Sequence, residues 1–437
     1  MRLDVHVLGQ RVGQLAREGP QHVFSYLPEV PPERFVSLTM PVRLQSYVWP
    51  ELHPVFQMNL PEGYLKDALR RRFGPVATVD DMSLLALTGR RTIGRVQVVP
   101  HGTELEHAQP ALDLAGLLSS RDAQRLFLEY VEQGLAEGVA GVMPKALAAV
   151  PGDHDKATVL TEDYIVKTGP HDLPGLAINE HLCLEAARRA GIEVPETRLS
   201  ADGSVLAIRR FDGRTQERLG FEDFCALKGL SPYRKYEGSH EDLAKLLKTY
   251  AAAQQLGGSR DQLFRLVTFN HAVHNSDAHL KNYAMLYSST DDARLAPAYD
   301  ILTVPAYPEF HHDIPGLTLY GKKTWSCGKL LLRYAQQWLD IRAEAAKPVI
   351  EQVSDALRSA APEVKQYADG FAEFREVGKR MLEFWDRGII GIQPDPRASV
   401  PSSGLRESTG LSNPKRRRRR KRNPFRSEDG GFSHKVR

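Results

Sequence analysis

The segment HNSDAHLKNYAML, residues 274–286, places Asn, Asp, His, Lys and Asn close together between two apolar runs that a fold would bury. Within it, Asp277 and Asn282 have the spacing D-x-x-x-x-N, and Asp300 follows after the apolar lead-in RLAPAY. Phosphoryl transfer needs such groups: one carboxylate accepts the proton of the attacking hydroxyl, and carboxylate and amide oxygens hold Mg²⁺ across nucleotide phosphates. The spacing alone arises about once by chance in a chain this long, so other features must support it.

Three features upstream of this segment favour the same chemistry. The stretch GVAGVMPK, residues 138–145, puts two glycines and a lysine in a turn before an expected strand, as in a loop that cradles phosphates, although an ordinary glycine turn has the same composition. Lys167 ends the strand YIVK, where its ammonium either pairs with the α- and β-phosphates or lies at the surface. The order of glycine loop, strand lysine, helix with Glu180, second strand, helical region and then Asp300 matches the order of parts in protein kinases.

The histidines of the region raise an alternative, a zinc site made by His271, His274 and His279 together with Asp277. His274 and His279 are five residues apart, which fits one helix face poorly, and the chain has no H-E-x-x-H motif. We therefore favour a histidine that orients a neighbouring carboxylate, or that packs in the core, over a zinc ligand.

Composition indicates a soluble globular protein, with 42% hydrophobic and 26% charged residues among 437, a length typical of two or three domains. The chain has no run of about 18 apolar residues, so no membrane span is expected, and its start lacks the pattern of a signal peptide. Cys183, Cys225 and Cys327 lie far apart without a C-x-x-C motif. This cysteine usage favours a reducing cytoplasm and gives neither a disulfide framework nor a thiolate zinc site.

The net charge of +4 is unevenly distributed. From Arg397 onward there are 13 Lys and Arg against 3 Asp and Glu, a tail of +10, which leaves the rest of the chain at −6. The tail includes KRRRRRKR, Lys415 to Arg422, which is either a solvated disordered segment or a site of weak, non-specific attraction to nucleic acid.

If all eight of these cations neutralise phosphates, the affinity for nucleic acid should fall with salt at a log–log slope of about −7. A chain truncated after Ile392 should then lose this binding in filter-binding titrations with DNA and RNA. Equal binding by the truncated and full-length chains would contradict a nucleic-acid role for the tail.

Periodicity divides the chain into an α+β unit at residues 1–110, a nucleotide-binding lobe at 111–220, a helical lobe at 221–392 and a tail, expected to be disordered, at 393–437. Strands are expected at 2–17 (as a hairpin), 34–42, 94–100, 145–150, 157–169 and 204–212. Helices are expected at 61–74, 79–89, 119–134, 179–191, 240–255, 261–275, 329–345, 347–360 and 371–388. Strands with one intervening helix indicate a small antiparallel lobe in the second region.

The chain resembles the HipA-like serine/threonine kinases, which are toxins of bacterial toxin–antitoxin systems. The resemblance spans nearly all of residues 1–330, and its most specific parts are NSDAHLKN followed by LAPAYD, supported by SPYRKYE. It implies a bilobal, protein-kinase-like α+β fold. The expected parts are a small N-terminal α+β subdomain, a mixed nucleotide-binding lobe, an all-helical catalytic lobe and a disordered basic tail.

The resemblance implies a role for each candidate residue, motif by motif. Asp277 looks like the catalytic base, and Asn282 and Asp300 look like the ligands of Mg²⁺. Arg209 to Phe211 would form the hinge that binds adenine through its backbone. The other residues assigned to ATP binding are Lys167, Lys281 and the glycine loop with Gly138, Val139, Ala140, Gly141 and Lys145.

Two positions depart from the family pattern. Glu is frequent in relatives where this chain has Arg209, which affects only the side-chain part of the hinge contact. Relatives also commonly carry a serine at the start of the glycine loop, and its autophosphorylation ejects the loop and silences the enzyme. Here that position holds Gly138.

Because residues 138–145 contain no Ser or Thr, we predict that self-silencing by this route is absent and that any autophosphorylation maps elsewhere. Mass spectrometry of the purified chain after incubation with ATP is the measurement. A phosphopeptide whose modified residue lies within 138–145 would contradict this prediction.

The family also implies partners. Its members are typically neutralised by a DNA-binding helix-turn-helix antitoxin (HipB-like), so DNA would be contacted through the partner. The best-known substrates are aminoacyl-tRNA synthetases, whose modification halts translation. Two alternatives stay open, a catalytically silent co-repressor acting with its antitoxin and a small-molecule phosphotransferase. The complete set of lysine, two aspartates and asparagine favours the kinase, since a silent relative is free to lose them.

Overall fold

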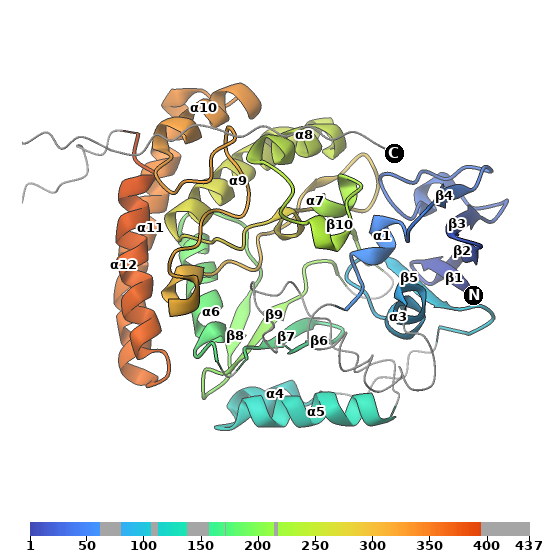
Figure 1. Ribbon diagram of the computed structural model, residues 1–437, viewed down its shortest axis with the longest axis horizontal. Coiled ribbons are helices and arrows are strands. Elements are labelled where there is room, and N and C mark those ends of the chain that lie inside the picture. Colours follow the sequence, from blue (N-terminus) through green and yellow to red (C-terminus); the bar gives the residue numbers. More distant parts are fainter. Residues whose placement is uncertain (62–79, 106–111, 138–156, 171, 214–216, 395–437) are drawn as a thin grey trace, which may run out of the picture. The chain divides into compact units, whose positions relative to one another are not determined.

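The N-terminal part of the chain is built on a five-stranded antiparallel sheet with the strand order β4-β3-β2-β1-β5 (Figure 1). The computed structural model describes residues 1–61, 80–105, 112–137, 157–170, 172–213 and 217–394. β1 (Arg2–Val7) and β2 (Gln10–Glu18) form the predicted hairpin, and its two-residue turn has Leu8 and Gly9 at φ 52° and 78°, the positive values that tight hairpin turns require. The sheet is completed by β3 (Gln21–Tyr26), β4 (Tyr47–Trp49) and β5 (Val96–Pro100).

The prediction of a strand at residues 34–42 is wrong. The segment contains only an isolated bridge between Ser37 and Met40. The Tyr26 hydroxyl forms hydrogen bonds with backbone groups of this segment. It accepts from the Val36 amide at 2.8 Å and donates to the Met40 carbonyl at 2.6 Å. Because a side chain satisfies these groups, the segment has no need of a neighbouring strand.

Two short helices, α1 (Pro54–Gln57) and α3 (Asp81–Thr88), accompany this sheet. α3 confirms the second helix predicted for the N-terminal unit. The Asp80 carboxylate caps it by accepting from the Ser83 amide at 2.9 Å, and the helix ends at Gly89. The helix predicted at 61–74, its first residue apart, lies outside the described residues, as do the strand predicted at 145–150 and the glycine loop at 138–145.

The second part of the chain is a four-stranded antiparallel sheet in the order β6-β7-β9-β8 with helices around it. Its elements are α4 (Leu114–Ser119), α5 (Ala123–Glu137), β6 (Ala157–Leu160), β7 (Tyr164–Thr168), α6 (Leu176–Arg189), β8 (Thr197–Leu199) and β9 (Val205–Arg209). Helix α6 and the strands confirm the predicted antiparallel lobe. The single strand expected at 157–169 is in fact the β6–β7 hairpin, which turns at residues 161–163.

Successive side chains along β7 and β9 point to opposite faces of this sheet. On one face, Val166 packs in a cluster with Phe127 of α5, and α4 and α5 lie along that side in Figure 1. On the other face, Ile165 and Ile208 belong to a different core cluster. Since side chains alternate with a period of two, Lys167 lies on the same face as Ile165.

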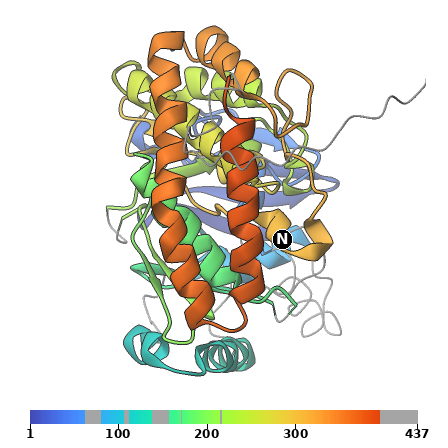
Figure 2. The same cartoon turned by 90° about the vertical axis from the view of Figure 1, so that its left-hand side faces the viewer.

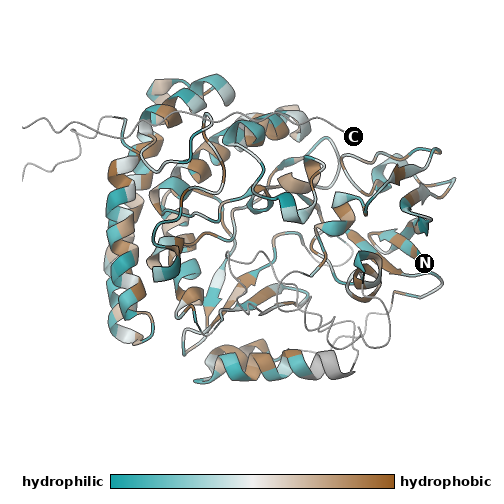
Figure 3. Ribbon diagram, viewed as in Figure 1, coloured by the Kyte–Doolittle hydropathy of each residue, from teal (hydrophilic) through white to brown (hydrophobic). Residues whose placement is uncertain are grey.

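The third part of the described chain is mainly helical. Its helices are α7 (Phe224–Leu227), α8 (His240–Tyr250), α9 (Ala253–Ala272), α10 (Gly328–Trp338), α11 (Ala343–Gly370) and α12 (Arg375–Gly391). α11 and α12 lie side by side, and both hydrophobic and hydrophilic stretches run along them (Figures 2 and 3). Among the described residues, no helix has the length and apolar character needed to cross a membrane.

The helix predicted at 240–255 is divided into α8 and α9. The Ala252 amide donates to the Ala293 carbonyl at 2.8 Å, outside any helix, so the chain turns there before α9 begins. The segments predicted at 329–345 and 347–360 also differ from the observed bounds, because α11 begins within the first and continues past the second.

The helical lobe also contains a three-stranded sheet in the order β10-β11-β12, so the expectation of an all-helical lobe was wrong in this respect. Its strands are β10 (Gly220–Asp223), β11 (Ala284–Tyr287) and β12 (Arg294–Leu295). β10 and β11 are buried along their whole length and therefore show no alternation of apolar and polar residues. A Cβ atom at Gly220 would lie 2.1 Å from the Tyr287 ring, so the pairing requires glycine.

Glu222 of β10 joins this sheet to the N-terminal part of the chain. Its carboxylate is 1% exposed and accepts hydrogen bonds from the Leu38 amide at 2.7 Å and from the Ser37 and Tyr287 hydroxyls at 2.6 Å each. Burial raises the pKa of Glu222 above its ordinary value. The loop between β3 and β4 is thus bound to the helical lobe through a buried acid.

Candidate active site

A cleft of about 600 Å³, open solvent at its mouth included, brings together segments from all three parts of the chain. Its wall combines apolar side chains with a few charged ones, as expected of a small-molecule site. The lining residues are Met58, Asn59, Ile93, Ile165, Lys167, Ile208, Phe211, Phe221, Asp223, His279, Lys281, Tyr299 and Asp300.

Lys167 is the centre of a buried charged group in this cleft. Its ammonium lies 2.9 Å from the Glu180 carboxylate of α6 and also forms an ion pair with Asp300. The three side chains are 7–13% exposed. Burial alone would lower the pKa of Lys167, but the charges of Asp300 and Glu180 outweigh it and raise that pKa. Lys167 is therefore a cation held by two carboxylates and not a surface lysine.

The backbone around Asp300 is fixed by Asn275, a residue of the 274–286 segment to which the sequence assigned no role. Asp300 has φ 53°, a left-handed conformation that non-glycine residues rarely adopt. The Asn275 side-chain amide donates to the Asp300 carbonyl at 3.2 Å and to the Asn270 side chain at 3.0 Å. His274 also has a positive φ, 55°. Strained residues of this kind cluster at functional sites.

Asp277 is buried, at 4% exposure, and its Oδ1 accepts a hydrogen bond from the Tyr236 hydroxyl. The Nε2 atom of His279 lies 3.8 Å from the same oxygen. Burial, together with the charges of Lys235 and Lys281, lowers the pKa of His279 well below its ordinary value, so the ring is neutral at pH 7. Tyr236 comes from the motif SPYRKYE, and that motif was the only sequence signal for its position.

Asn282 provides a direct test of whether the site fits a divalent cation. The residue is 4% exposed; its Oδ1 accepts from the His279 amide at 3.2 Å, while its Nδ2 has no hydrogen-bond partner among the described residues. Rotating the amide by 180° would put the oxygen where the unpartnered nitrogen lies, but it would give up the bond from the His279 amide. The Asn282 oxygen and the Asp300 carboxylate are both of the hard oxygen type that Mg²⁺ prefers.

Only one residue of the predicted hinge at 209–211 lines the cleft. The Arg209 side chain is 64% exposed and pairs with Glu196 at 3.6 Å. The Arg209 amide donates to the Glu196 carbonyl, and the Arg210 amide to that of Asp163, both at 2.8 Å. Phe211 is the member of this segment whose side chain lines the cleft.

Lys281 also lines the cleft, as the sequence motif indicated. Its side chain is buried, and its carbonyl accepts from the Tyr299 hydroxyl at 2.7 Å. The structure therefore brings together Lys167, Phe211, Lys281 and Asp300 in one cleft, whereas Asp277 and Asn282 are not among the residues that line it. The glycine loop lies outside the described residues.

The three histidines once considered for zinc face different neighbours. The His274 ring packs on Trp325 with centroids 4.6 Å apart, the His271 ring on His240 at 5.1 Å, and the His279 ring lies beside Tyr236. Within the described ranges, no group of three or more His, Cys, Asp or Glu side chains is placed to hold a metal ion. The geometry favours packing for His271 and His274 and proximity to a carboxylate for His279.

A small antiparallel sheet whose lysine pairs with a glutamate on the next helix, packed with a helical lobe that carries the D-x-x-x-x-N motif, defines a protein-kinase-like fold. One of the similar solved structures comes from the Shewanella oneidensis MR-1 complex of the toxin–antitoxin proteins HipA and HipB with operator DNA. Its TM-score is 0.63 at 19% identity, over 88% of this chain and 97% of that chain. At this identity the likeness shows the fold.

The chain belongs to the HipA family. The family model described as the HipA-like C-terminal domain matches residues 138–361, and the HipA N-terminal domain matches residues 3–99. Two Sinorhizobium fredii proteins named as candidate kinases are similar to it. Y4mE is 28% identical over 378 residues, covering 77% of this chain and 88% of its own length. Y4dM is 27% identical over 359 residues, covering 72% and 83%.

Proposed function

We propose that the chain is an ATP- and Mg²⁺-dependent serine/threonine protein kinase. The observation that carries the proposal is the paired state of Lys167, which binds both Glu180 and Asp300 at the wall of the cleft. In protein kinases a lysine–glutamate pair and a metal-binding aspartate must both be in place for phosphoryl transfer. A structural ion pair alone would not need a cleft beside it.

Each buried polar residue then has a role. Asp277 accepts the proton of the attacking serine or threonine hydroxyl, and the Tyr236 hydroxyl holds its carboxylate in position. Lys167 binds the α- and β-phosphates. Asn282 and Asp300 would hold Mg²⁺, which supplies neutralising charge across the phosphates when it is bound.

The apolar wall of the cleft suits the adenine ring. Ile165 and Ile208 of the sheet and Phe211 of the hinge line it. We assign adenine to this wall, with the hinge backbone at Phe211 as its polar contact and Lys281 near the phosphates. The resemblance also assigns phosphate binding to the glycine loop at 138–145, which lies outside the described residues.

We further propose that the chain is the toxin of a toxin–antitoxin system with a HipB-like antitoxin. The support is family membership together with the Shewanella oneidensis structure, in which HipA is found with HipB and operator DNA. In this organisation residues 1–110, 111–220 and 221–392 act as N-terminal subdomain, nucleotide-binding lobe and catalytic lobe, followed by the tail at 393–437. The proposed substrate is a translation component such as an aminoacyl-tRNA synthetase.

Quantitative phosphoproteomics tests the proposal, with cells expressing either the wild-type chain or Asp277→Ala. A kinase should produce phosphosites and growth arrest only with the wild type, and those sites identify the substrate. A co-repressor without catalysis should act equally in both strains. Growth arrest that persists unchanged in the variant would therefore favour the co-repressor.

A further inference from the structure

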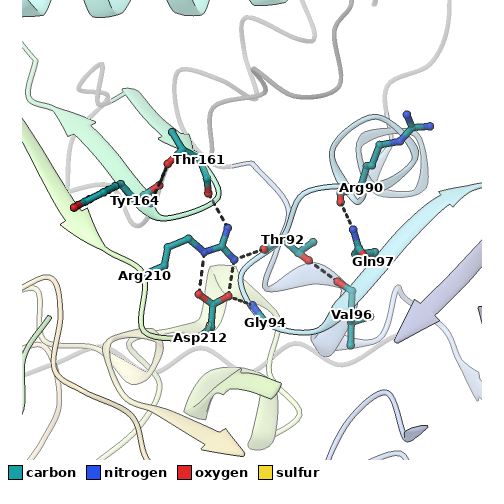
Figure 4. A network of polar contacts seen from close by, with 9 residues as sticks. All are labelled: Arg90, Thr92, Gly94, Val96, Gln97, Thr161, Tyr164, Arg210 and Asp212. Carbon is teal, nitrogen blue, oxygen red and sulfur yellow. Dashed lines mark hydrogen bonds and ion pairs between the residues drawn. The ribbon is translucent and has the colours of Figure 1, made fainter. Parts of the chain in front are cut away.

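The hinge segment contains a buried ion pair that the proposed reaction does not use. Arg210 and Asp212 face each other with both side chains 2% exposed, and their atoms lie 2.5 Å (Nη2 to Oδ2) and 2.9 Å (Nε to Oδ1) apart (Figure 4). Burial alone would raise the pKa of Asp212, but the charge and hydrogen bonds of Arg210 lower it. The Asp212 carboxylate therefore stays ionised inside the protein at neutral pH.

Arg210 and Asp212 each also form a hydrogen bond with the N-terminal part of the chain. The Arg210 guanidinium donates to the Thr92 carbonyl at 3.0 Å, and the Asp212 carboxylate accepts from the Gly94 amide at 2.7 Å. A third bond runs from Arg210 to the Thr161 carbonyl in the β6–β7 turn, at 3.1 Å. Figure 4 shows these three segments meeting at the guanidinium and the carboxylate.

Two of the residues that line the cleft are flanked by these bonds. Phe211 stands between Arg210 and Asp212 in the chain, and Ile93 stands between Thr92 and Gly94. Both side chains are part of the cleft wall. Two hydrogen bonds, one on each side, therefore tie the loop that carries Ile93 to the segment that carries Phe211.

The Ile93 loop is also packed tightly against the same wall. Gly94 has φ 90°, and a Cβ atom there would lie 3.2 Å from the Phe221 amide nitrogen. Phe221, Phe211 and Tyr299 form a ring cluster with centroids 5.9–6.1 Å apart, and all three line the cleft. The loop before β5 is thus packed closely against Phe221.

A buried ion pair is weak evidence for a gain in stability, because desolvation of the two charges offsets most of their attraction. The hydrogen bonds of this pair instead fix the positions of the segments that they join. We propose that Arg210 and Asp212 are positioning residues for nucleotide binding: they fix Ile93 and Phe211 together in the cleft, so that the N-terminal unit completes the nucleotide site. This inference rests on the proposed function, since it takes the cleft to be the nucleotide site.

The test variant is Arg210→Lys in the full-length chain. Lysine keeps a cation beside Asp212 but cannot reproduce the planar fork that also binds two carbonyls. We expect the Kd for ADP, measured by calorimetry without Mg²⁺, and the KM for ATP each to rise by roughly ten-fold, with kcat changed by less than about three-fold. The matched control is Arg198→Lys on β8, whose ion pair with Glu196 is exposed, and it should behave as wild type.

A second variant, Ile93→Ala, leaves the ion pair intact and removes only the lining side chain. It should also weaken ADP binding. The increase in the ADP Kd that Ile93→Ala causes should be smaller in the Arg210→Lys background than in the wild type, because both changes act on the same contact. Equal ADP affinity of the wild type, Arg210→Lys and Ile93→Ala would overturn this inference and leave the proposed function standing. A wild-type chain that binds no adenine nucleotide would overturn both.

Discussion

Replacing Asp277 with Asn should lower the rate of phosphoryl transfer by about 10²–10⁴-fold, the contribution expected of a general base. The substitution preserves an oxygen that can accept from the Tyr236 hydroxyl, so the local hydrogen bond and the fold should be retained. It removes the carboxylate that takes the proton of the attacking hydroxyl. The measurement is transfer of labelled phosphate from ATP to a protein substrate identified by phosphoproteomics, at saturating ATP.

Two comparisons make this result specific. The affinity of Asp277→Asn for ADP should stay within about two-fold of wild type, since the proposed base contacts the protein substrate and not the nucleotide. Asp355→Asn on α11, where the carboxylate is 74% exposed, is the matched control and should transfer phosphate at the wild-type rate. A variant of Asp277 that retained full activity would refute the assignment of the base.

Replacing Lys167 with Met should both abolish nucleotide binding and destabilise the protein. The Glu180 and Asp300 carboxylates would be left facing each other in a largely buried site without their cation. Breaking a buried ion pair by removing one partner costs about 3–5 kcal/mol. Urea denaturation should show this loss of unfolding free energy, and Lys347→Met, an exposed lysine on α11, should not.

The pH dependence of this effect has a defined sign. The pKa of Lys167 is raised by its two carboxylates, so the stabilisation it gives is complete below the ordinary lysine pKa near 10.4 and is lost only as the pH rises beyond that value. In Lys167→Met, protonation of one carboxylate relieves their repulsion. The deficit relative to wild type should therefore be smaller at pH 5 than at pH 8. An equal deficit at both pH values would contradict the charge-based explanation.

Much of the fold followed from local pattern. The β1–β2 hairpin, α3, α5 and α6 each have a strong local signal: a Gly turn, an Asp cap, or apolar residues at helical spacing. The segment at 34–42 and the strands β10–β12 did not, because their structure depends on distant partners. Tyr26 satisfies the first, and β10 pairs with a strand more than 60 residues away.

The candidate site was predictable to a similar extent. Lys167 and Asp300 have fixed places in a known order, and the cleft brings them together with Lys281. The residues that hold them in position were not predicted. Asn275 and Tyr236 act through single hydrogen bonds to groups 25 and 41 residues away, and no local pattern encodes such a bond.

The bonds from Glu222 to the loop between β3 and β4, and from Asp212 to Gly94, bear on how members of this family can be recombined. The two domain models match separate stretches of sequence, which suggests interchangeable modules. Yet these bonds join backbone atoms of the first stretch to buried acids of the second. A chimaera that exchanges the first hundred residues between relatives should therefore work only under one condition. The loop between β3 and β4 and the loop before β5 must have the same length and backbone course in both relatives.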